Sequence, residues 1–226
     1  MIAGISWWKL LSVVLILYSV IAGLHNAVPE LPILHESIRN LFFHVPMWFS
    51  MTALLGASAF YSIKYLNSQK NTDDYMATST ASVATICGIA GIITGMMWAR
   101  VTWEQWWNND PKQTVALIGL LMYLAYFVLR NAIEDHEKKA RISAVTNIIF
   151  FFIFIPIIYV VPRLTDSLHP GNGGNPGFNA YDLDAGLRLI FYPAVLGWIL
   201  FCFWIAQTTA RMLLIDSTMK LQQTDV

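Results

Sequence analysis

Residues 142–161 read ISAVTNIIFFFIFIPIIYVV, an apolar run without a charged side chain. A membrane-spanning helix needs about 20 consecutive, mostly apolar residues, so this run is long enough to cross a bilayer. Five further runs of the same kind occupy residues 7–28, 41–66, 76–98, 114–133 and 186–212. We therefore predict an all-α, polytopic membrane protein that folds as a bundle of six transmembrane helices, in one domain covering residues 1–226.

The composition supports this fold and limits the function. The chain is 56% hydrophobic and only 12% charged, whereas an average soluble domain is about 25% charged. The formal net charge is zero and no basic cluster is present, so we expect no nucleic-acid partner. If the N-terminus is cytoplasmic, nine of the 14 Lys and Arg residues lie on the inner side, and the positive-inside rule then places both termini in the cytoplasm.

A tryptophan-rich stretch, MMWARVTWEQWWNNDPKQT at 96–114, lies between the third and fourth apolar runs. Trp103, Trp106 and Trp107 are spaced at i, i+3 and i+4, which places them on one face of a helix. We expect a short amphipathic helix that lies in the membrane interface on the outer side. Because tryptophan is enriched at every membrane interface, the stretch is interpreted either as an anchor or as a platform for a flat apolar ligand.

Two histidines are predicted to face the same side of the membrane as this stretch. His44 lies in LFFHVPMWF at the start of the second run, and His169 lies in the outer loop 162–185, whose middle is rich in glycine and proline. Taken alone, His44 is more typical of a histidine that hydrogen-bonds a neighbouring helix, and a loop histidine is usually just exposed. His25 and His35 are weaker candidates, because their surroundings indicate a helix end and a turn.

Taken together, the two histidines predict a haem site. In a bis-histidine site the haem iron takes one nitrogen ligand from each face of the porphyrin, and aromatic rings pack against the flat apolar group. Zinc is less well matched, since no cysteine or clustered carboxylate completes a tetrahedral set. The chain has no CxxCH motif, so a covalent haem link is not expected. The propionates would meet basic residues predicted on the same side, namely Arg39, Arg100, Lys112 and Arg163.

Three stretches resemble the CcmC branch of the haem-handling proteins of cytochrome c maturation. WARVTWEQWWNNDPKQT (98–114) resembles the tryptophan-rich segment of that family, RNLFFHVPMWFS (39–50) its second-span motif, and SLHPG (167–171) its second histidine motif. The length and the six spans also resemble this branch, and the likeness covers nearly the whole chain. The resemblance implies that His44 and His169 are the axial ligands of a non-covalently bound haem b.

The resemblance also implies a place in a larger system. The protein would lie in the bacterial cytoplasmic membrane and present haem on the periplasmic face to a CcmE-like haem chaperone. It would associate with CcmA- and CcmB-like subunits of an ABC transporter and with a small CcmD-like membrane subunit. It would be a haem delivery protein without turnover chemistry of its own and not an enzyme. Because the chain has no P-loop, any ATP-driven step would come from the partner ATPase. The further haem contacts implied are Trp98, Trp103, Trp106, Trp107, Asp110, Arg39 and Lys112.

Two positions depart from the CcmC pattern and keep alternatives open. Asn109 stands where the family has a tryptophan before the aspartate, and Lys112 stands where CcmC proteins commonly have arginine. The turn DPKQT is closer to the CcsA branch, so a CcsA-like haem export and ligation component is one alternative. A membrane electron carrier with b-type haem is another, although such carriers ordinarily place ligand histidines within their spans. A permease or channel without a cofactor would carry ionisable residues inside its spans.

Overall fold

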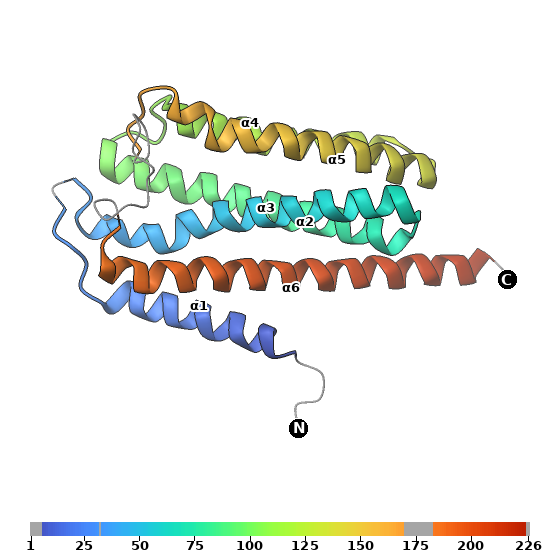
Figure 1. Ribbon diagram of the computed structural model, residues 1–226, viewed down its shortest axis with the longest axis horizontal. Coiled ribbons are helices and arrows are strands. Elements are labelled where there is room, and N and C mark those ends of the chain that lie inside the picture. Colours follow the sequence, from blue (N-terminus) through green and yellow to red (C-terminus); the bar gives the residue numbers. More distant parts are fainter. Residues whose placement is uncertain (1–5, 32, 170–182, 225–226) are drawn as a thin grey trace.

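The computed structural model describes residues 6–31, 33–169 and 183–224 (Figure 1). Over these residues the chain forms helices and no strands. The predicted glycine- and proline-rich middle of the loop 162–185 lies outside the described residues. The helices in chain order are α1 (Trp7–His25), η1 (His35–Asn40), α2 (Leu41–Ser68), α3 (Asn71–Trp103), α4 (Pro111–Ala132), α5 (His136–Tyr159), η2 (Val161–Arg163) and α6 (Ala185–Thr224).

Six helices are long and apolar enough to cross a membrane, which confirms the predicted all-α, six-span fold and identifies a multi-pass membrane protein. Several helices are longer than the predicted apolar runs. Helix α3 extends beyond the run 76–98 at both ends, and α6 continues past residue 212. Helix α5 begins six residues before its predicted run, at His136, because the Asp135 side chain accepts a hydrogen bond from the Lys138 amide at 2.7 Å and caps the helix.

Helices α2 and α3 form an antiparallel pair in the middle of the bundle (Figure 1). Helix α6 packs against both of them, and α1 lies on the far side of α6, which is its main contact. Helices α4 and α5 pack against each other and cover the opposite side of the central pair. The centre of the bundle is therefore built from α2 and α3, with α6 on one side and α4 and α5 on the other, while α1 lies outside α6.

A stripe of small residues allows α2 and α3 to approach closely. A Cβ atom added at Gly91 of α3 would lie 2.8 Å from Cε2 of Trp48, and one added at Gly88 would lie 2.8 Å from Sδ of Met51. Small residues serve this purpose in membrane bundles, where close van der Waals packing replaces the hydrophobic effect between helices. The stripe thereby fixes which residues of α2 face the backbone of α3.

The two ends of the bundle differ in the polar residues they carry. One end, called the histidine end, carries His44 and His169. At the other end, called the opposite end, Arg130 in the last turn of α4 makes two bonds to Asp74 in the first turn of α3, at 2.8 and 2.6 Å. Both side chains are buried. Each charge also complements its helix dipole, because cations are favoured at a helix C-terminus and anions at an N-terminus.

The tryptophan-rich stretch does not form the predicted amphipathic helix. Helix α3 continues through Trp103 and ends there, because Glu104 adopts the left-handed conformation with φ of 63°. Trp106 and Trp107 follow in a segment without helical structure. The i, i+3, i+4 spacing was therefore misleading: these tryptophans belong to a helix end and to the turn after it.

The turn between α3 and α4 explains a departure from the family pattern. Asn109 has φ of 55°, a left-handed conformation that asparagine adopts more readily than a tryptophan. Its Oδ1 atom accepts a hydrogen bond from Nε1 of Trp107 at 3.1 Å. Asp110 then caps α4 by accepting from the Lys112 amide at 2.9 Å, and Pro111 occupies the first helical position. A left-handed cap at one side and an N-cap at the other leave too few residues for a helix between them.

Candidate functional site

His44 lies near the start of α2 with its ring against α3. A Cβ atom at Gly95 would lie 2.7 Å from Cε1 of His44, so only glycine leaves room for the ring. The ring nitrogen Nδ1 is 3.1 Å from Oγ1 of Thr94. The rings of Trp48 and Trp98 pack edge-on, with centroids 6.4 and 5.9 Å from that of His44. The imidazole is therefore held between the two central helices.

The hydrogen bonds of the Thr94 hydroxyl indicate which nitrogen of the His44 ring carries a hydrogen. It donates to the Ala90 carbonyl at 2.7 Å, and because a hydroxyl has a single hydrogen, its oxygen is left as an acceptor. This arrangement favours the neutral tautomer in which Nδ1 of His44 donates to Thr94 and Nε2 carries the lone pair. The Gly91 carbonyl, 3.2 Å from the Thr94 hydroxyl, is a second acceptor beside this contact. Thr94 is held in turn by Asn40, whose Nδ2 donates to the Thr94 carbonyl at 3.0 Å.

His169 is held by the residue that caps α4. Its Nδ1 atom lies 2.9 Å from Oδ1 of Asp110. The same carboxylate accepts bonds from the Ser167 hydroxyl at 2.9 Å and from the Leu168 amide at 2.7 Å. Asp110 therefore joins the segment before residue 170 to the start of α4, although the two are far apart in the sequence.

The charge of the Asp110 carboxylate indicates which nitrogen of the His169 ring carries a hydrogen. Burial raises the pKa of the Asp110 carboxyl, but the hydrogen bonds from His169, the Leu168 amide and Ser167 outweigh burial and hold this pKa well below its usual range. An ionised carboxylate only accepts hydrogen bonds. Nδ1 of His169 therefore carries a hydrogen, and in the neutral ring the lone pair is on Nε2. The ring of Trp103 packs edge-on, with its centroid 4.8 Å away.

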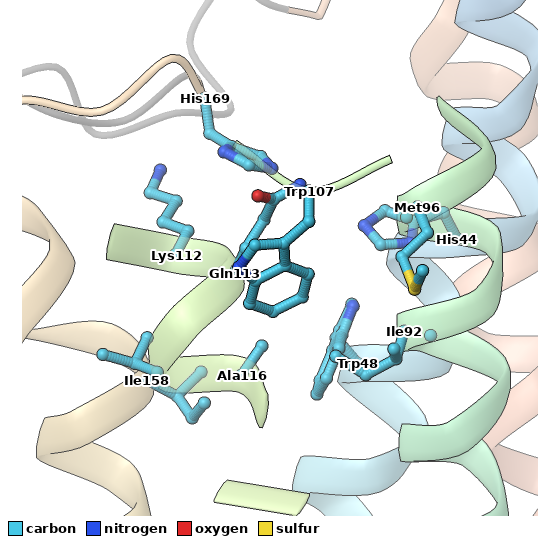
Figure 2. Close-up of a pocket in the computed structure, with 13 residues that line it drawn as sticks. His44, Trp48, Ile92, Met96, Trp107, Lys112, Gln113, Ala116, Ile158 and His169 are labelled. Carbon is cyan, nitrogen blue, oxygen red and sulfur yellow. The ribbon is translucent and has the colours of Figure 1, made fainter. Parts of the chain in front are cut away.

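His44 and His169 line one cavity of about 170 Å³ at the histidine end. Figure 2 shows the two histidines on opposite sides of this cavity, with Trp107 between them in that view. Lys112 and Gln113 add polar atoms at the start of α4. Most of the remaining wall is apolar and is formed by Trp48, Ile92, Met96, Trp107, Ala116 and Ile158.

The four predicted tryptophans occupy three kinds of position. Trp107 lines the cavity. Trp98 and Trp103 do not line it, but each packs its ring against one of the two histidines. Trp106 is 54% exposed and stands outside the lining. The stretch is thus partly a wall of the cavity and partly a support for the histidine rings.

The two basic residues predicted to contact haem, Arg39 and Lys112, occupy different positions relative to the cavity. Lys112 lines the cavity, whereas Arg39 does not. The guanidinium of Arg39 donates to the carbonyls of Gly23 and Asn26 at 2.9 and 2.8 Å and pairs with Glu36 at 2.6 Å. Arg39 therefore joins the C-terminal end of α1 to η1.

The weaker histidine candidates do not line the cavity. Nδ1 of His25 lies 2.9 Å from the Ile21 carbonyl of the same helix. His35 begins η1 and has a left-handed backbone, with φ of 42°.

Sequence reasoning missed three residues that shape the site, namely Thr94, Gly95 and Ser167. The glycine could have been found, because Gly88, Gly91 and Gly95 fall on one face of α3 and indicate close helix packing. The two hydroxyl residues carry no comparable signal. Single Ser and Thr residues in apolar helices and loops are common, and only the fold shows which of them meets a histidine.

Comparison with known proteins gives a consistent result. Residues 2–225 match the family CcmC, described as heme exporter protein C. The heme exporter protein C of Bradyrhizobium diazoefficiens is 30% identical over 134 residues, which cover 59% of this chain and 50% of that protein. The protein of the same name from Paracoccus denitrificans is 26% identical over 135 residues, covering 60% and 56%, and that of Escherichia coli K12 is 23% identical over 140 residues, covering 61% and 56%. The matched region spans about half the length of these curated relatives. Because the family match extends over almost the whole chain, the protein belongs to the CcmC family.

Proposed function

We propose that this protein binds haem b as cargo at the histidine end, with His44 and His169 as the two axial ligands of the iron. One observation carries the proposal: the two histidines line a single cavity, and each has its Nδ1 atom held by a hydrogen bond, which leaves Nε2 of the neutral ring to bind a metal. Histidines that bind metals almost always have the second ring nitrogen held in this way. Membership of a family described as heme exporter protein C supports the same cargo.

The donor set fits haem better than a bare metal ion. Two imidazoles complete the ligands of a haem iron, whereas a structural zinc needs four protein ligands. Within the described residues, no group of three or more His, Cys, Asp or Glu side chains gathers to hold a metal ion. Trp48 and Trp107 offer aromatic surface for a porphyrin, and Lys112 offers a cation for a propionate.

The cysteines support non-covalent binding. Cys87 and Cys202 are buried between α3 and α6, with their sulfur atoms 3.5 Å apart, and neither lines the cavity. A thioether bond to haem would need a cysteine beside the histidines. The proposal is therefore haem b, held by its two axial bonds and by packing, and able to leave.

In the proposed system the histidine end faces the periplasm and the protein lies in the bacterial cytoplasmic membrane. The positive-inside rule supports this orientation, because nine of the 14 Lys and Arg residues fall toward the opposite end. The protein passes haem to a CcmE-like chaperone and works with CcmA- and CcmB-like subunits and a small CcmD-like subunit. The chain contains no P-loop, so ATP hydrolysis belongs to the CcmA-like partner and this protein is a delivery component.

The ligand assignment is tested with purified, haem-loaded protein. We expect His44→Ala and His169→Ala each to convert the low-spin bis-histidine absorption spectrum to that of a haem with one histidine ligand. The matched control is His25→Ala, because among the described residues the His25 ring bonds its own helix, at the Ile21 carbonyl. If both site variants keep the wild-type spectrum, the assignment is wrong.

Delivery is tested separately, by mixing haem-loaded protein with a CcmE-like chaperone and measuring the haem that moves to it. Trp106→Ala provides the sharpest variant, because Trp106 is exposed and does not line the cavity. We expect it to keep haem and to transfer it more slowly. Transfer to the chaperone at no higher rate than to buffer would contradict the delivery role.

A further inference from the structure

The two histidines of the cavity have hydrogen-bond partners of unequal charge. Nδ1 of His169 donates to the carboxylate of Asp110 at 2.9 Å, whereas Nδ1 of His44 donates to the neutral hydroxyl oxygen of Thr94 at 3.1 Å. Each partner is also held by its own helix. The Thr94 hydroxyl donates toward the Ala90 carbonyl at 2.7 Å and lies 3.2 Å from the Gly91 carbonyl, and Asp110 accepts from the Lys112 amide at the start of α4.

This difference in charge changes how strongly each ring binds a metal. A hydrogen bond to an ionised acceptor is shorter and about twice as strong as one between neutral groups. An anionic acceptor also draws the Nδ1 hydrogen toward itself, which leaves more electron density on Nε2 and makes the imidazole a better ligand. A neutral hydroxyl does this much less. His169 is therefore the stronger of the two donors, and His44 the weaker.

The two rings also differ in their placement. His44 belongs to a transmembrane helix, and its ring is enclosed by Gly95 and by two tryptophan rings. His169 lies outside the helices, and its side chain is 27% exposed. His169 is therefore held by a segment outside the helices, whereas His44 is held within the packed helix pair.

We propose that Thr94 and Asp110 are positioning residues that rank the two axial ligands, so that the bond from His44 to the haem iron breaks first and His169 is the last ligand released. This inference rests on the proposed function and deepens it. One strong bond keeps haem on the protein, and one weak bond opens a coordination position that the acceptor's own ligand occupies. Thr94, which the sequence did not point to, supports the His44 bond only weakly, because its hydroxyl is a neutral partner.

The ranking is tested by resonance Raman spectroscopy of the reduced haem protein. His44→Ala leaves His169 as the histidine ligand, and His169→Ala leaves His44. We expect a higher iron–histidine stretching frequency in His44→Ala, because the remaining ring faces Asp110. Adding Asp110→Asn to His44→Ala should lower this frequency, whereas adding Thr94→Val to His169→Ala should change it little. Asparagine retains the helix cap of α4, which keeps the fold comparable.

A second measurement does not need the alanine variants. Haem loss to excess apomyoglobin is followed for wild type, Asp110→Asn and Thr94→Val. Loss of a partner that supports a metal ligand typically costs about 10–100-fold in affinity, and we expect Asp110→Asn to accelerate haem loss within this range. Thr94→Val should accelerate it by a smaller factor. Thr85→Val is the matched control, because Thr85 is a buried threonine of α3 bonded only to its own helix.

The outcomes separate this inference from the proposed function. Equal stretching frequencies in the two alanine variants, or the higher frequency in His169→Ala, would overturn the ranking while leaving both histidines as ligands. Equal acceleration by Asp110→Asn and Thr94→Val would overturn it as well. If neither histidine variant alters the haem spectrum, the proposed function itself fails.

Discussion

The histidine end and the opposite end of the bundle both bury polar side chains, but they do so in different ways. At the opposite end the charges face each other. Arg130 makes two bonds to Asp74, and Lys64 pairs with Asp73 at 2.8 Å. These contacts join the C-terminal ends of α2 and α4 to the N-terminal turn of α3. The buried charges of Asp73, Asp74 and Arg130 are each paired with an opposite charge, although the partner of Asp73, Lys64, is itself exposed. This end is therefore arranged to hold helices together.

At the histidine end the carboxylate of Asp110 has several hydrogen-bond donors, but the two histidine rings are bonded to the protein through one nitrogen each. Asp110 accepts bonds from several protein donors. His44 and His169, in contrast, each use one ring nitrogen for the protein and keep a lone pair at a cavity with mostly apolar walls. Burial of polar groups does not by itself indicate function, because both ends bury charged side chains. What indicates a ligand-binding site is a pair of side chains that the fold holds in place by one ring nitrogen each beside a shared cavity.

The largest expected effect is on stability at the opposite end. Arg130→Ala leaves Asp74 as a buried charge without its partner, which typically costs about 3–5 kcal/mol. We expect a large fall in the thermal unfolding temperature in detergent. The double variant Asp74→Leu with Arg130→Met should recover most of the loss, because a buried ion pair can be replaced by apolar side chains at little cost.

The same variants test whether the two ends are independent. The double variant should bind haem with the wild-type spectrum, since neither side chain comes near the cavity. A changed haem spectrum in a stable double variant would break the comparison, because the opposite end would then contribute to the ligand site.

A smaller loss of stability, but a larger loss of binding, is expected at Gly95. An alanine there places a Cβ atom 2.7 Å from Cε1 of His44, and the ring must move. Overpacking of this kind costs about 1–3 kcal/mol. We expect Gly95→Ala to fold, to unfold at a moderately lower temperature and to lose the bis-histidine haem spectrum.

The matched control for this prediction is Gly88→Ala on the same stripe. Its Cβ atom would meet the sulfur of Met51, a flexible side chain away from the cavity. The control should lower stability by a similar amount and keep the haem spectrum. Loss of haem in both variants would mean that the stripe acts only through the general packing of α2 on α3.

The fold was largely predictable because membrane helices have a strong signal. Each span must satisfy its backbone hydrogen bonds internally and present apolar side chains to lipid, so length and composition are sufficient to find it. The ends were less predictable. Capping by Asp110 and Asp135 makes α4 and α5 begin before their predicted apolar runs. The left-handed Glu104 ends α3, although the helical spacing of the tryptophans continues beyond it.

The site was predictable only in part. His44 and His169 could be identified because the chain has only five histidines and these two were predicted on the same side of the membrane. The positions of Thr94 and Arg39 depended on contacts between residues distant in sequence, which no local pattern encodes. Arg39 was predicted to meet a propionate, yet in the fold it binds backbone carbonyls at the end of α1.

The smallest expected effect is on the pH dependence of stability at the histidine end, where Asp110 holds His169. Its pKa is lower in the folded protein than the unfolded value of about 3.9. The carboxylate therefore adds stability above about pH 4, and this contribution is lost as the pH falls toward the folded pKa. We expect the haem-free wild type to lose more stability than Asp110→Asn between about pH 5 and pH 3, because the asparagine does not titrate.

The measurement is the difference between the unfolding temperatures of wild type and Asp110→Asn at each pH in this range. The contributions of the other carboxylates are common to both proteins and cancel in this difference. A difference that does not vary with pH would show that the hydrogen bonds of Asp110 do not depend on its charge, and Asp110 and Thr94 would then be equivalent supports for the two histidines.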